Sequence, residues 1–320
     1  MIHPQTISVT GANGFVGRSL CDQLQSRGFT VRRLVRSSSE NYDEEIEVGS
    51  INADTDWSAA LVGVNTVIHC AARVHVMNDE SADPLFEFRQ VNVDGALNLA
   101  LQAVKAGVRR LVFISSIKVN GELTDLDHPF TADQISVPSD PYGVSKYEAE
   151  IGLMALSEET GMEVVIIRSP LVYGPGVKAN FLSVMNWLQR GLPLPLGSIT
   201  ENRRSFVFID NLVSMIIACI NHPAAANQTF LVSDDEDLST AGLLERMAFA
   251  LGRPSKLITV STTLITLGAK LVGRADIAQR LCGSLQVDIK KTKDLLGWSP
   301  PVSVDEGLRA TAAHFLKKKS

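Results

Sequence analysis

The chain has 320 residues, of which 45% are hydrophobic and 20% are charged, and its formal net charge is −5. This length is enough for one large domain or for a domain with an appendage. The acidic balance gives no overall basic footprint, so the sequence predicts neither a nucleic-acid partner nor binding to an anionic membrane surface.

The cysteines give no sign of a disulfide or metal site. They stand far apart, at Cys21, Cys70, Cys219 and Cys282. They form no CxxC pair, and no histidine cluster has the spacing of metal ligands, so we predict reduced thiols and no metal. The first residues run directly into a strand pattern without the features of a signal peptide, which predicts a cytoplasmic protein.

Short apolar runs alternate with helical patterns through the first half of the chain. The runs predicted as buried strands are Thr6–Thr10, Val31–Val35, Thr66–Cys70 and Arg110–Ser115, with Val164–Arg168 and Thr229–Val232 as later strands. The helical patterns between the first strands are Gly17–Ser26, Trp57–Leu61 and Asn92–Ala106. This alternation predicts βαβ units and an α/β fold with a Rossmann-type, doubly wound parallel sheet.

Beyond residue 175 the pattern becomes less regular, and helical patterns dominate after residue 238. We expect residues 1–175 to form a dinucleotide-binding domain. Residues 176–320 are expected to form mostly a small, mainly helical substrate lobe, with some strands returning to the sheet. The apolar segment Leu257–Val272 is shorter than the ~20 residues of a membrane span and contains Lys270. We therefore expect a helix packed on the smaller lobe and no membrane insertion.

The turn between the first strand and the first helix is rich in glycine. Gly11 permits the tight turn, Gly14 lets the backbone approach a pyrophosphate, and Gly17 lets the helix pack closely on the strand. Its place directly after a strand and before an amphipathic helix supports a dinucleotide site. The GxxGxxG spacing differs from the GxGxxG of ordinary dinucleotide folds.

Arginines stand where NAD-binding folds usually place an acid. An Asp or Glu at the end of the second strand normally holds the ribose hydroxyls of NAD. This strand instead ends with Arg33 and Arg36, and the first acid is Glu40. Cations at this place attract the 2′-phosphate of NADP. The sequence therefore favours NADP(H), with NAD(H) as the alternative.

A serine, a tyrosine and a lysine have the types and spacing of an acid–base site. Tyr142 and Lys146 are spaced i, i+4 in a predicted helix, so they lie on one face. A tyrosine with its ordinary pKa of about 10 is a poor base at neutral pH, and a nearby ammonium lowers that pKa. The fourth strand runs into Ser116, which supplies a hydroxyl for a substrate oxygen. Together with the glycine turn, these residues predict a catalytic site.

In this order the motifs resemble the extended short-chain dehydrogenase/reductases of the NAD-dependent epimerase/dehydratase family. That family includes UDP-glucose 4-epimerases, sugar 4-ketoreductases and 4,6-dehydratases. Further matching segments are Asn92–Gly95, Arg168–Gly176, Arg203–Asp210 and Leu296–Pro300. The resemblance covers nearly the whole chain.

The resemblance implies roles for individual residues. Tyr142 would be the acid/base, Lys146 would lower its pKa and hold the nicotinamide ribose, and Ser116 would bind the sugar C4 oxygen. The cofactor contacts implied are Gly11, Asn13, Gly14, Phe15, Val16, Gly17, Ala71, Ala72, Asn92 and Pro170. The substrate contacts implied are Ser116, Lys118, Asn180, Arg204 and Arg280, for a UDP-sugar. A homodimer built through the helix Tyr142–Glu159 is also expected by resemblance.

The neighbours of Ser116 help to separate the reactions of the family. Dehydratases carry Asp-Glu directly after the catalytic Ser or Thr, to act at a second carbon. Here Ile117-Lys118 follows Ser116, which disfavours dehydration. The segments Ala71–Met77 and Ile117–Asn120 resemble bacterial surface-polysaccharide enzymes that reduce UDP-4-keto-6-deoxy-HexNAc. With the arginines after the second strand, they favour a UDP-4-keto-6-deoxy-hexosamine 4-reductase, and a UDP-hexose (glucose or GlcNAc) 4-epimerase is the alternative.

Two departures from the family pattern leave the sugar specificity open. Ser50 stands where the family usually has an adenine-contacting Asp, and Leu171 where many epimerases have a substrate-contacting Asn. Two other classes also remain as hypotheses: a non-catalytic NAD(P)-binding regulator on the same fold, and a steroid or flavonoid reductase. The intact catalytic residues argue against the first, and Asn180 and Arg204 argue against the second.

Overall fold

The computed structural model describes residues 5–38, 45–74, 83–134, 136–271 and 273–318. Glu40, the last residues of the Ala71–Met77 motif (75–77) and Val272 lie outside them. Within the described residues a 7-stranded sheet has the order β3-β2-β1-β4-β5-β6-β9, with every ladder parallel. Its strands are β1 (Thr6–Thr10), β2 (Thr30–Val35), β3 (Glu45–Glu47), β4 (Thr66–His69), β5 (Arg110–Ser116), β6 (Glu163–Ser169) and β9 (Gln228–Leu231). The Rossmann-type fold expected from the sequence is confirmed.

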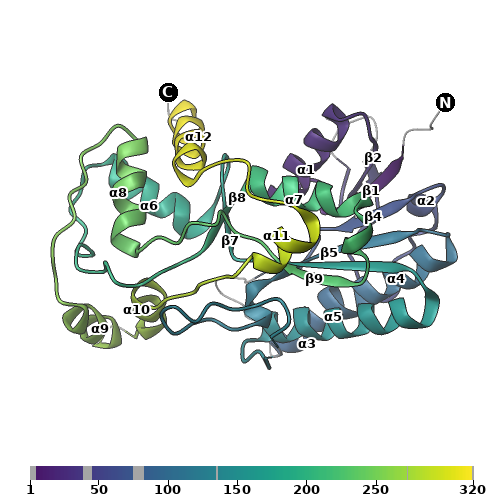
Figure 1. Cartoon of the computed structure of the whole chain (residues 1–320), viewed down its shortest axis with the longest axis horizontal. Helices are drawn as coiled ribbons and strands as arrows, with labels where there is room; N and C mark the ends of the chain where they lie inside the picture. Colours follow the sequence, from purple (N-terminus) through teal and green to yellow (C-terminus); the bar gives the residue numbers. More distant parts are fainter. Residues whose placement is uncertain (1–4, 39–44, 75–82, 135, 272, 319–320) are drawn as a thin grey trace.

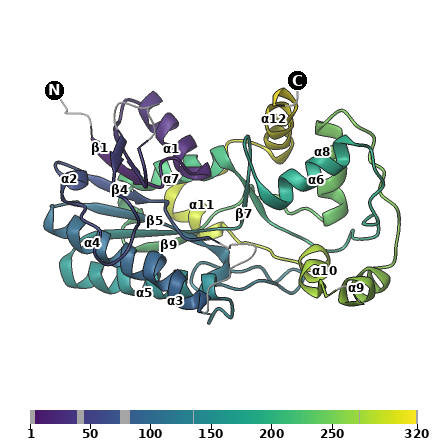
Figure 2. The ribbon, with the colours of Figure 1, turned by 180° about the vertical axis from the view of Figure 1, so that it is seen from behind.

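Helices cover both faces of the sheet (Figures 1 and 2). On one face lie α1 (Phe15–Ser26) and α7 (Ile209–Asn221), and on the other α4 (Gly95–Lys105) and α5 (Pro141–Thr160). The shorter α2 (Ser58–Leu61) and α3 (Pro84–Arg89) flank the α4–α5 pair. Apolar side chains of each helix layer pack on the sheet, so a separate hydrophobic core forms on each face. The predicted strands agree with the observed ones to within one residue.

The helical lobe lies beside the sheet and contains α6 (Ala179–Gln189), α8 (Thr240–Ala250), α9 (Thr262–Leu271), α10 (Ala275–Cys282) and α12 (Val304–Lys317). The parallel pair β7 (Leu171–Tyr173) and β8 (Phe206–Phe208) lies between this lobe and the sheet. The chain then returns to the sheet through α7 and β9, and α11 (Lys290–Leu296) packs against β9. The boundary at residue 175 stays a prediction, because no single point divides the two parts.

The apolar segment after Leu257 contains a helix of the lobe, as expected, but this helix is poorly covered. The segment forms α9, which contacts α10, yet none of the residues of α9 is buried. No helix in the described part of the chain is both long and apolar enough to cross a membrane.

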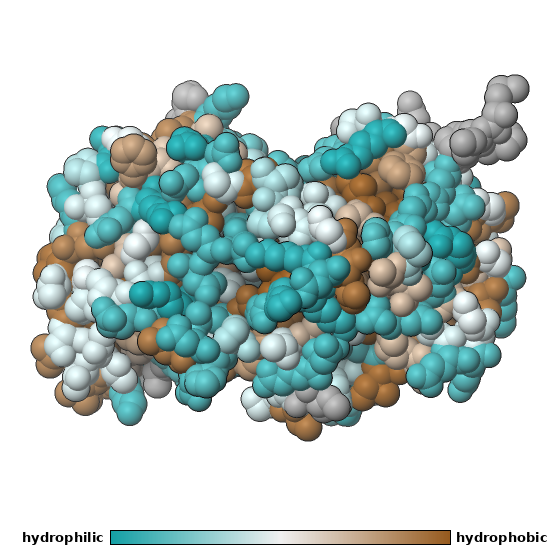
Figure 3. Space-filling view, viewed as in Figure 1, coloured by the Kyte–Doolittle hydropathy of each residue, from teal (hydrophilic) through white to brown (hydrophobic). Residues whose placement is uncertain are grey.

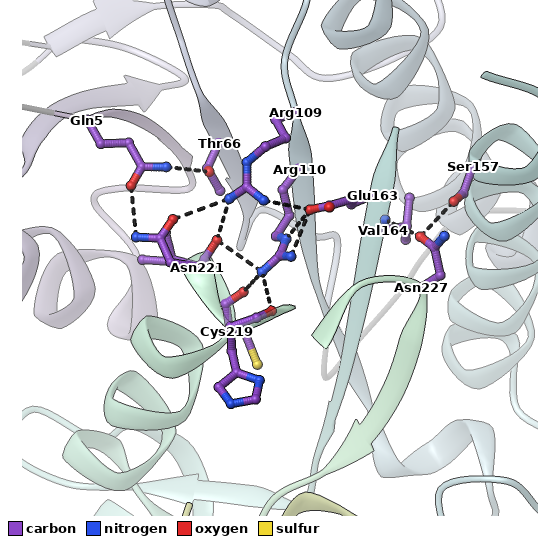
Figure 4. Close-up of polar contacts among 12 residues, drawn as sticks. Gln5, Thr66, Arg109, Arg110, Ser157, Glu163, Val164, Cys219, Asn221 and Asn227 are labelled. Carbon is purple, nitrogen blue, oxygen red and sulfur yellow. Dashed lines mark hydrogen bonds and ion pairs between the residues drawn. The ribbon is translucent and has the colours of Figure 1, made fainter. Parts of the chain in front are cut away.

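A buried arginine joins two layers at the edge of the sheet where the strands begin (Figure 4). Arg110 is the first residue of β5 and is fully buried. Its guanidinium donates to the carbonyls of Cys219, Ile220 and His222 at 2.5, 3.0 and 3.0 Å, and it pairs with Glu163 at 2.7 Å. The last carbonyls of a helix lack partners within the helix, so this cation satisfies the end of α7. It lies at the opposite end of β5 from Ser116.

Candidate active site

Three of the segments singled out in the sequence meet where the parallel strands end. The glycine turn follows β1, Ala71 and Ala72 follow β4, and Ser116 is the last residue of β5. A direct hydrogen bond joins the first two segments, because the Ala71 amide donates to the Thr10 hydroxyl at 3.1 Å. This carboxyl edge is where open parallel sheets bind their ligands.

The glycine turn has the shape of a phosphate cradle. Gly11 has a φ of +64°, and a Cβ on it would lie 2.9 Å from the Ala71 nitrogen. A Cβ on Gly17 would lie 2.2 Å from the carbonyl oxygen of Gly11, so the helix packs on the turn only when this residue is glycine. At the first turn of α1 the N-cap Gly14 makes no side-chain cap, which leaves backbone N–H groups for an anion. Asn13 and Gly14 are exposed, and Phe15 and Val16 are half-buried. The turn therefore fits the pyrophosphate of a dinucleotide.

The two arginines at the end of β2 have different surroundings. The Arg33 side chain is only 1% exposed and donates to Asp22 at 2.6 Å and to Gln25 at 2.9 Å, both on α1. These contacts hold the guanidinium against α1, so we withdraw the role in binding a 2′-phosphate that the sequence suggested for it. Arg36 follows β2 and is exposed. It is the remaining cation for the NADP hypothesis.

The catalytic residues expected from the sequence come together from β5 and α5. Asp140 caps α5 by accepting from the Gly143 amide at 3.2 Å, which places Tyr142 in the first helical turn. The side chain of Ser116 hydrogen-bonds with that of Tyr142. One turn further along, the buried Lys146 ammonium donates to the Ile114 carbonyl at 2.9 Å. The serine and the phenol therefore face one another at the carboxyl edge of β5.

The electrostatics of Tyr142 differ from the expectation. Burial raises the pKa of Tyr142 to about 12, the hydrogen bond with Ser116 lowers it, and the Asp140 carboxylate raises it. The Lys146 ammonium donates to the Ile114 carbonyl at 2.9 Å and lies 4.2 Å from the centre of the Phe113 ring, and its expected lowering of the pKa of Tyr142 stays a prediction. In this state Tyr142 is a neutral phenol that has a proton to donate.

The buried ammonium of Lys146 has a lowered pKa. Burial lowers its pKa to about 8, and the nearby Glu150 carboxylate acts in the opposite direction. Close by, burial lowers the pKa of His69 to about 3, and its ring hydrogen-bonds with Thr10 at 2.7 Å. His69 is therefore neutral at physiological pH, while Lys146 still carries its charge at pH 7 and loses it above about pH 8.

Asn92 lies in a π-helical turn, Gln90–Asp94, directly before α4. Such turns are frequent at functional sites. The buried Asn92 amide donates to Ser145 at 3.0 Å and to the Arg73 carbonyl at 3.0 Å, and it accepts from the Arg73 amide at 2.8 Å. Ser145 in turn donates to the Tyr142 carbonyl at 2.8 Å. Asn92 thus joins the segment after β4 to the first turn of α5, and its expected contact with a cofactor stays a prediction.

A buried polar network behind Lys146 did not emerge from the sequence reasoning. Glu150 pairs with Arg168 at 2.6 Å and accepts from Ser115 at 2.5 Å, while Arg168 also donates to Asn120 at 3.0 Å. These contacts join the ends of β5 and β6 to the segment that follows Ser116. The available signal was the position of Glu150, four residues after Lys146 on the same face of the helix.

The proposed substrate residues are divided between the sheet and the lobe. Lys118 follows Ser116 and pairs with Glu122 at 2.7 Å and with Asp140 at 3.2 Å. Asn180 is exposed in the first turn of α6, and Pro170 is buried between β6 and β7. Lys118 is thus paired with acidic neighbours, and its expected contact with the sugar stays a prediction.

Arg204 and Arg280 are brought together although 76 residues separate them. The Arg204 guanidinium donates to the carbonyls of Arg280 at 2.9 Å and Gly283 at 3.1 Å. Burial lowers the pKa of Arg204, and the positive charge of Arg280 lowers it further. Neither guanidinium pairs with an acid among the described side chains. Guanidinium groups without an acidic partner have the chemistry that suits a diphosphate, and that role stays a prediction for Arg204 and Arg280.

Comparison with known proteins gives consistent results. Residues 7–233 match the NAD dependent epimerase/dehydratase family. A UDP-glucose 4-epimerase of Vibrio cholerae is 50% identical over 316 residues, covering 98% of this chain and 96% of that protein. Among solved structures, MoeE5 in complex with UDP-glucose and NAD has a TM-score of 0.78 at 23% identity, with 98% and 100% of the two chains covered. The UDP-glucose 4-epimerase of Thermotoga maritima with UDP-glucose has a TM-score of 0.76 at 24% identity, with 99% and 100% covered.

Proposed function

Because the chain belongs to the NAD dependent epimerase/dehydratase family, we propose that this enzyme is a 4-epimerase of a UDP-linked hexose. The observation that carries the proposal is the pairing of Ser116 with Tyr142 at the carboxyl edge of β5, beside the glycine cradle. The 50% identical relative bears the name of this activity. NAD, when bound along the glycine turn, supplies the hydride acceptor and donor for C4.

The residues of this chain perform the proton transfer at the sugar O4. Ser116 orients the O4 hydroxyl, the phenolate form of Tyr142 takes its proton during oxidation, and the resulting phenol returns it during reduction. The raised pKa of Tyr142 favours the phenol, so the proton is held firmly between the two half-reactions. Because only the phenolate can take the O4 proton, the raised pKa makes oxidation slow at neutral pH, and oxidation should become faster as the pH rises.

The substrate lobe supplies the contacts for the nucleotide. Arg204 and Arg280 would bind the diphosphate of UDP, and Asn180 at the start of α6 would bind nearby. These contacts are remote from C4, so they hold the substrate equally in both half-reactions. This division leaves the sugar free to present either face to the cofactor.

A second candidate is the reduction of a UDP-4-keto-6-deoxy-hexosamine in surface-polysaccharide biosynthesis. It is favoured by the exposed Arg36, which suits NADPH, and by the exposed Leu171, where many epimerases carry Asn. The commitment of Arg33 to α1 removes half of the argument for NADPH. We therefore place epimerisation with NAD(H) first and reduction with NADP(H) second.

The experiment starts with the cofactor content of the purified protein. An epimerase retains NAD that is released on denaturation, and it interconverts UDP-glucose or UDP-GlcNAc with the C4 epimer. Oxidation of added NADPH with a UDP-4-keto-6-deoxy sugar, and no epimerisation, would replace the first candidate by the second. Tyr142→Phe should abolish either activity, with Tyr147→Phe on the same helix as the matched control. Full activity of Tyr142→Phe would overturn the assigned chemistry.

A homodimer through α5 and a cytoplasmic location belong to the same proposal. Both rest on the resemblance and on the sequence, and both stay predictions.

A further inference from the structure

Helix α9 presents an apolar face with no protein partner among the described residues. Leu264, Leu267 and Leu271 are 61%, 53% and 80% exposed, and their i, i+3, i+7 spacing places them on one face. Ile258 and Ile277, on either side of the helix, are also exposed. Contiguous apolar surface of this kind marks an interaction site.

The chain segment that contains this face has a net charge opposite in sign to that of the whole chain. Between residues 253 and 282 the sequence contains five cations and one acid, namely Arg253, Lys256, Lys270, Arg274, Arg280 and Asp276. The net charge of −5 over 320 residues therefore hides a local positive segment. Apolar side chains flanked by Lys and Arg are typical of helices that lie in the plane of a membrane interface.

The position of α9 leaves its apolar face open to a flat surface. The helix lies at the lower corner of the lobe in Figure 1, and the view from behind in Figure 2 places it at the same lower edge. Figure 3 shows brown and pale residues over this corner. It follows α8 and precedes α10, whose Arg280 carbonyl accepts from Arg204. The helix that α9 contacts, α10, thus carries Arg280, one of the proposed nucleotide contacts.

We propose that α9 docks the substrate lobe on the surface of an anionic lipid bilayer. The leucine face enters the boundary between headgroups and acyl chains, while Lys270, Arg274 and Lys256 face the anionic headgroups. With ten residues the helix is too short to span the bilayer, so the association is peripheral and reversible. A second copy of the chain fits less well, because a symmetric pair of α9 helices would bring the same cations together.

The docking is independent of the proposed reaction, and its test reads binding directly. Full-length protein is floated with vesicles of phosphatidylcholine alone or of phosphatidylcholine mixed with phosphatidylglycerol. We expect binding only to the mixed vesicles, weakened by salt because the charge contribution is screened. Leu267→Glu/Leu271→Glu should reduce partitioning by roughly tenfold or more, since both apolar contacts are lost. Lys270→Glu/Arg274→Glu should remove the preference for phosphatidylglycerol.

Controls separate docking from unfolding and from self-association. Val62→Glu introduces one carboxylate at a 69% exposed residue outside the lobe, as a control for each single leucine substitution, and it should bind vesicles like the unaltered protein. Thermal melts must match for all variants. Failure of the unaltered protein to float, or equal flotation of Leu267→Glu/Leu271→Glu, would overturn the proposal. Loss of an oligomer in the leucine variant, with no lipid binding by the unaltered protein, would assign the face to a second copy instead.

Discussion

Lys146 carries its charge in a place that water hardly reaches, and its pKa of about 8 against an ordinary value of 10.5 reflects that cost. Between these two values the unfolded chain keeps the proton while the folded protein loses it. Stability from this group therefore rises as the pH increases from about 8 to 10.5, and below pH 8 the full penalty is present. The penalty is about 3 kcal/mol at one pKa unit per 1.36 kcal/mol.

Lys146→Met should make the protein more stable and inactive. The variant removes the buried charge but leaves the Ile114 carbonyl without its donor, so we expect a gain of about 1 to 3 kcal/mol at pH 7. Urea unfolding at pH 7 and pH 9.5 measures it, and the gain should shrink at the higher pH. A variant less stable than the parent at pH 7 would show that the lysine is worth more to the fold than its burial costs.

Arg204 should contribute to substrate binding more than to turnover. A charge-assisted hydrogen bond is worth about 1.5 to 3 kcal/mol, so Arg204→Met should raise KM for the UDP-sugar by roughly 10- to 100-fold. Because the contact is remote from C4, kcat should change much less. Arg203→Met is the matched control, since the Arg203 guanidinium donates to the Thr200 and Asn202 carbonyls. Equal KM values for the two variants would contradict the diphosphate assignment.

At the scale of elements, Arg109 and Arg110 offer a direct comparison, because both contact Glu163 and the end of α7 (Figure 4). Arg110→Met leaves several buried carbonyls without a donor and should cost about 3 to 5 kcal/mol in the free energy of unfolding. Arg109→Met removes a partly exposed pair and should cost about 1 kcal/mol or less. Chemical denaturation of both variants gives the difference. If Arg110→Met costs as little as Arg109→Met, about 1 kcal/mol or less, the end of α7 is held by its apolar packing alone.

The sequence predicted long elements well and short ones poorly. The central strands are continuous apolar runs, so their pattern was sufficient. The strands β3, β7 and β8 have three residues each, and their pairing depends on neighbours that are distant in the chain. The π-helical turn at Asn92 was expected as ordinary helix, because residue periodicity does not reveal one extra residue in a turn.

The candidate site shows the same division. Gly11, Gly17, Tyr142 and Lys146 act through local spacing, which a sequence displays directly. The burial of Arg33 against Asp22 depends on how α1 packs on β2, and the Glu150–Arg168 pair joins a helix to a strand. Contacts of this kind, between separate elements, are not visible in residue spacing.

At the scale of the whole molecule, the site combines two parts with different tasks. In the proposed function the sheet edge supplies the acid–base residues and the cradle, and the lobe supplies the arginine pair from α10 and the segment before β8. The paired strands β7 and β8 lie between the lobe and the sheet, so they connect these two parts of the molecule. Changes in the lobe should therefore alter substrate affinity, while changes at the edge should alter the chemistry.

The outer face of α4 and α5 carries exposed apolar side chains and is a candidate contact between two copies of the chain. Leu101 and Ile151 are 48% and 52% exposed on these two adjacent helices, which is consistent with a symmetric contact between two copies. Ile151→Glu would place one unpaired carboxylate from each copy in that contact. The dissociation constant of the dimer should therefore rise more than about 100-fold. Sedimentation velocity should find a dimer for the parent and a monomer for the variant. Phe249→Glu, at a 79% exposed residue of α8, should leave the dimer intact. A parent that sediments as a monomer, or an Ile151→Glu variant that sediments as a dimer, would rule out this face as the interface.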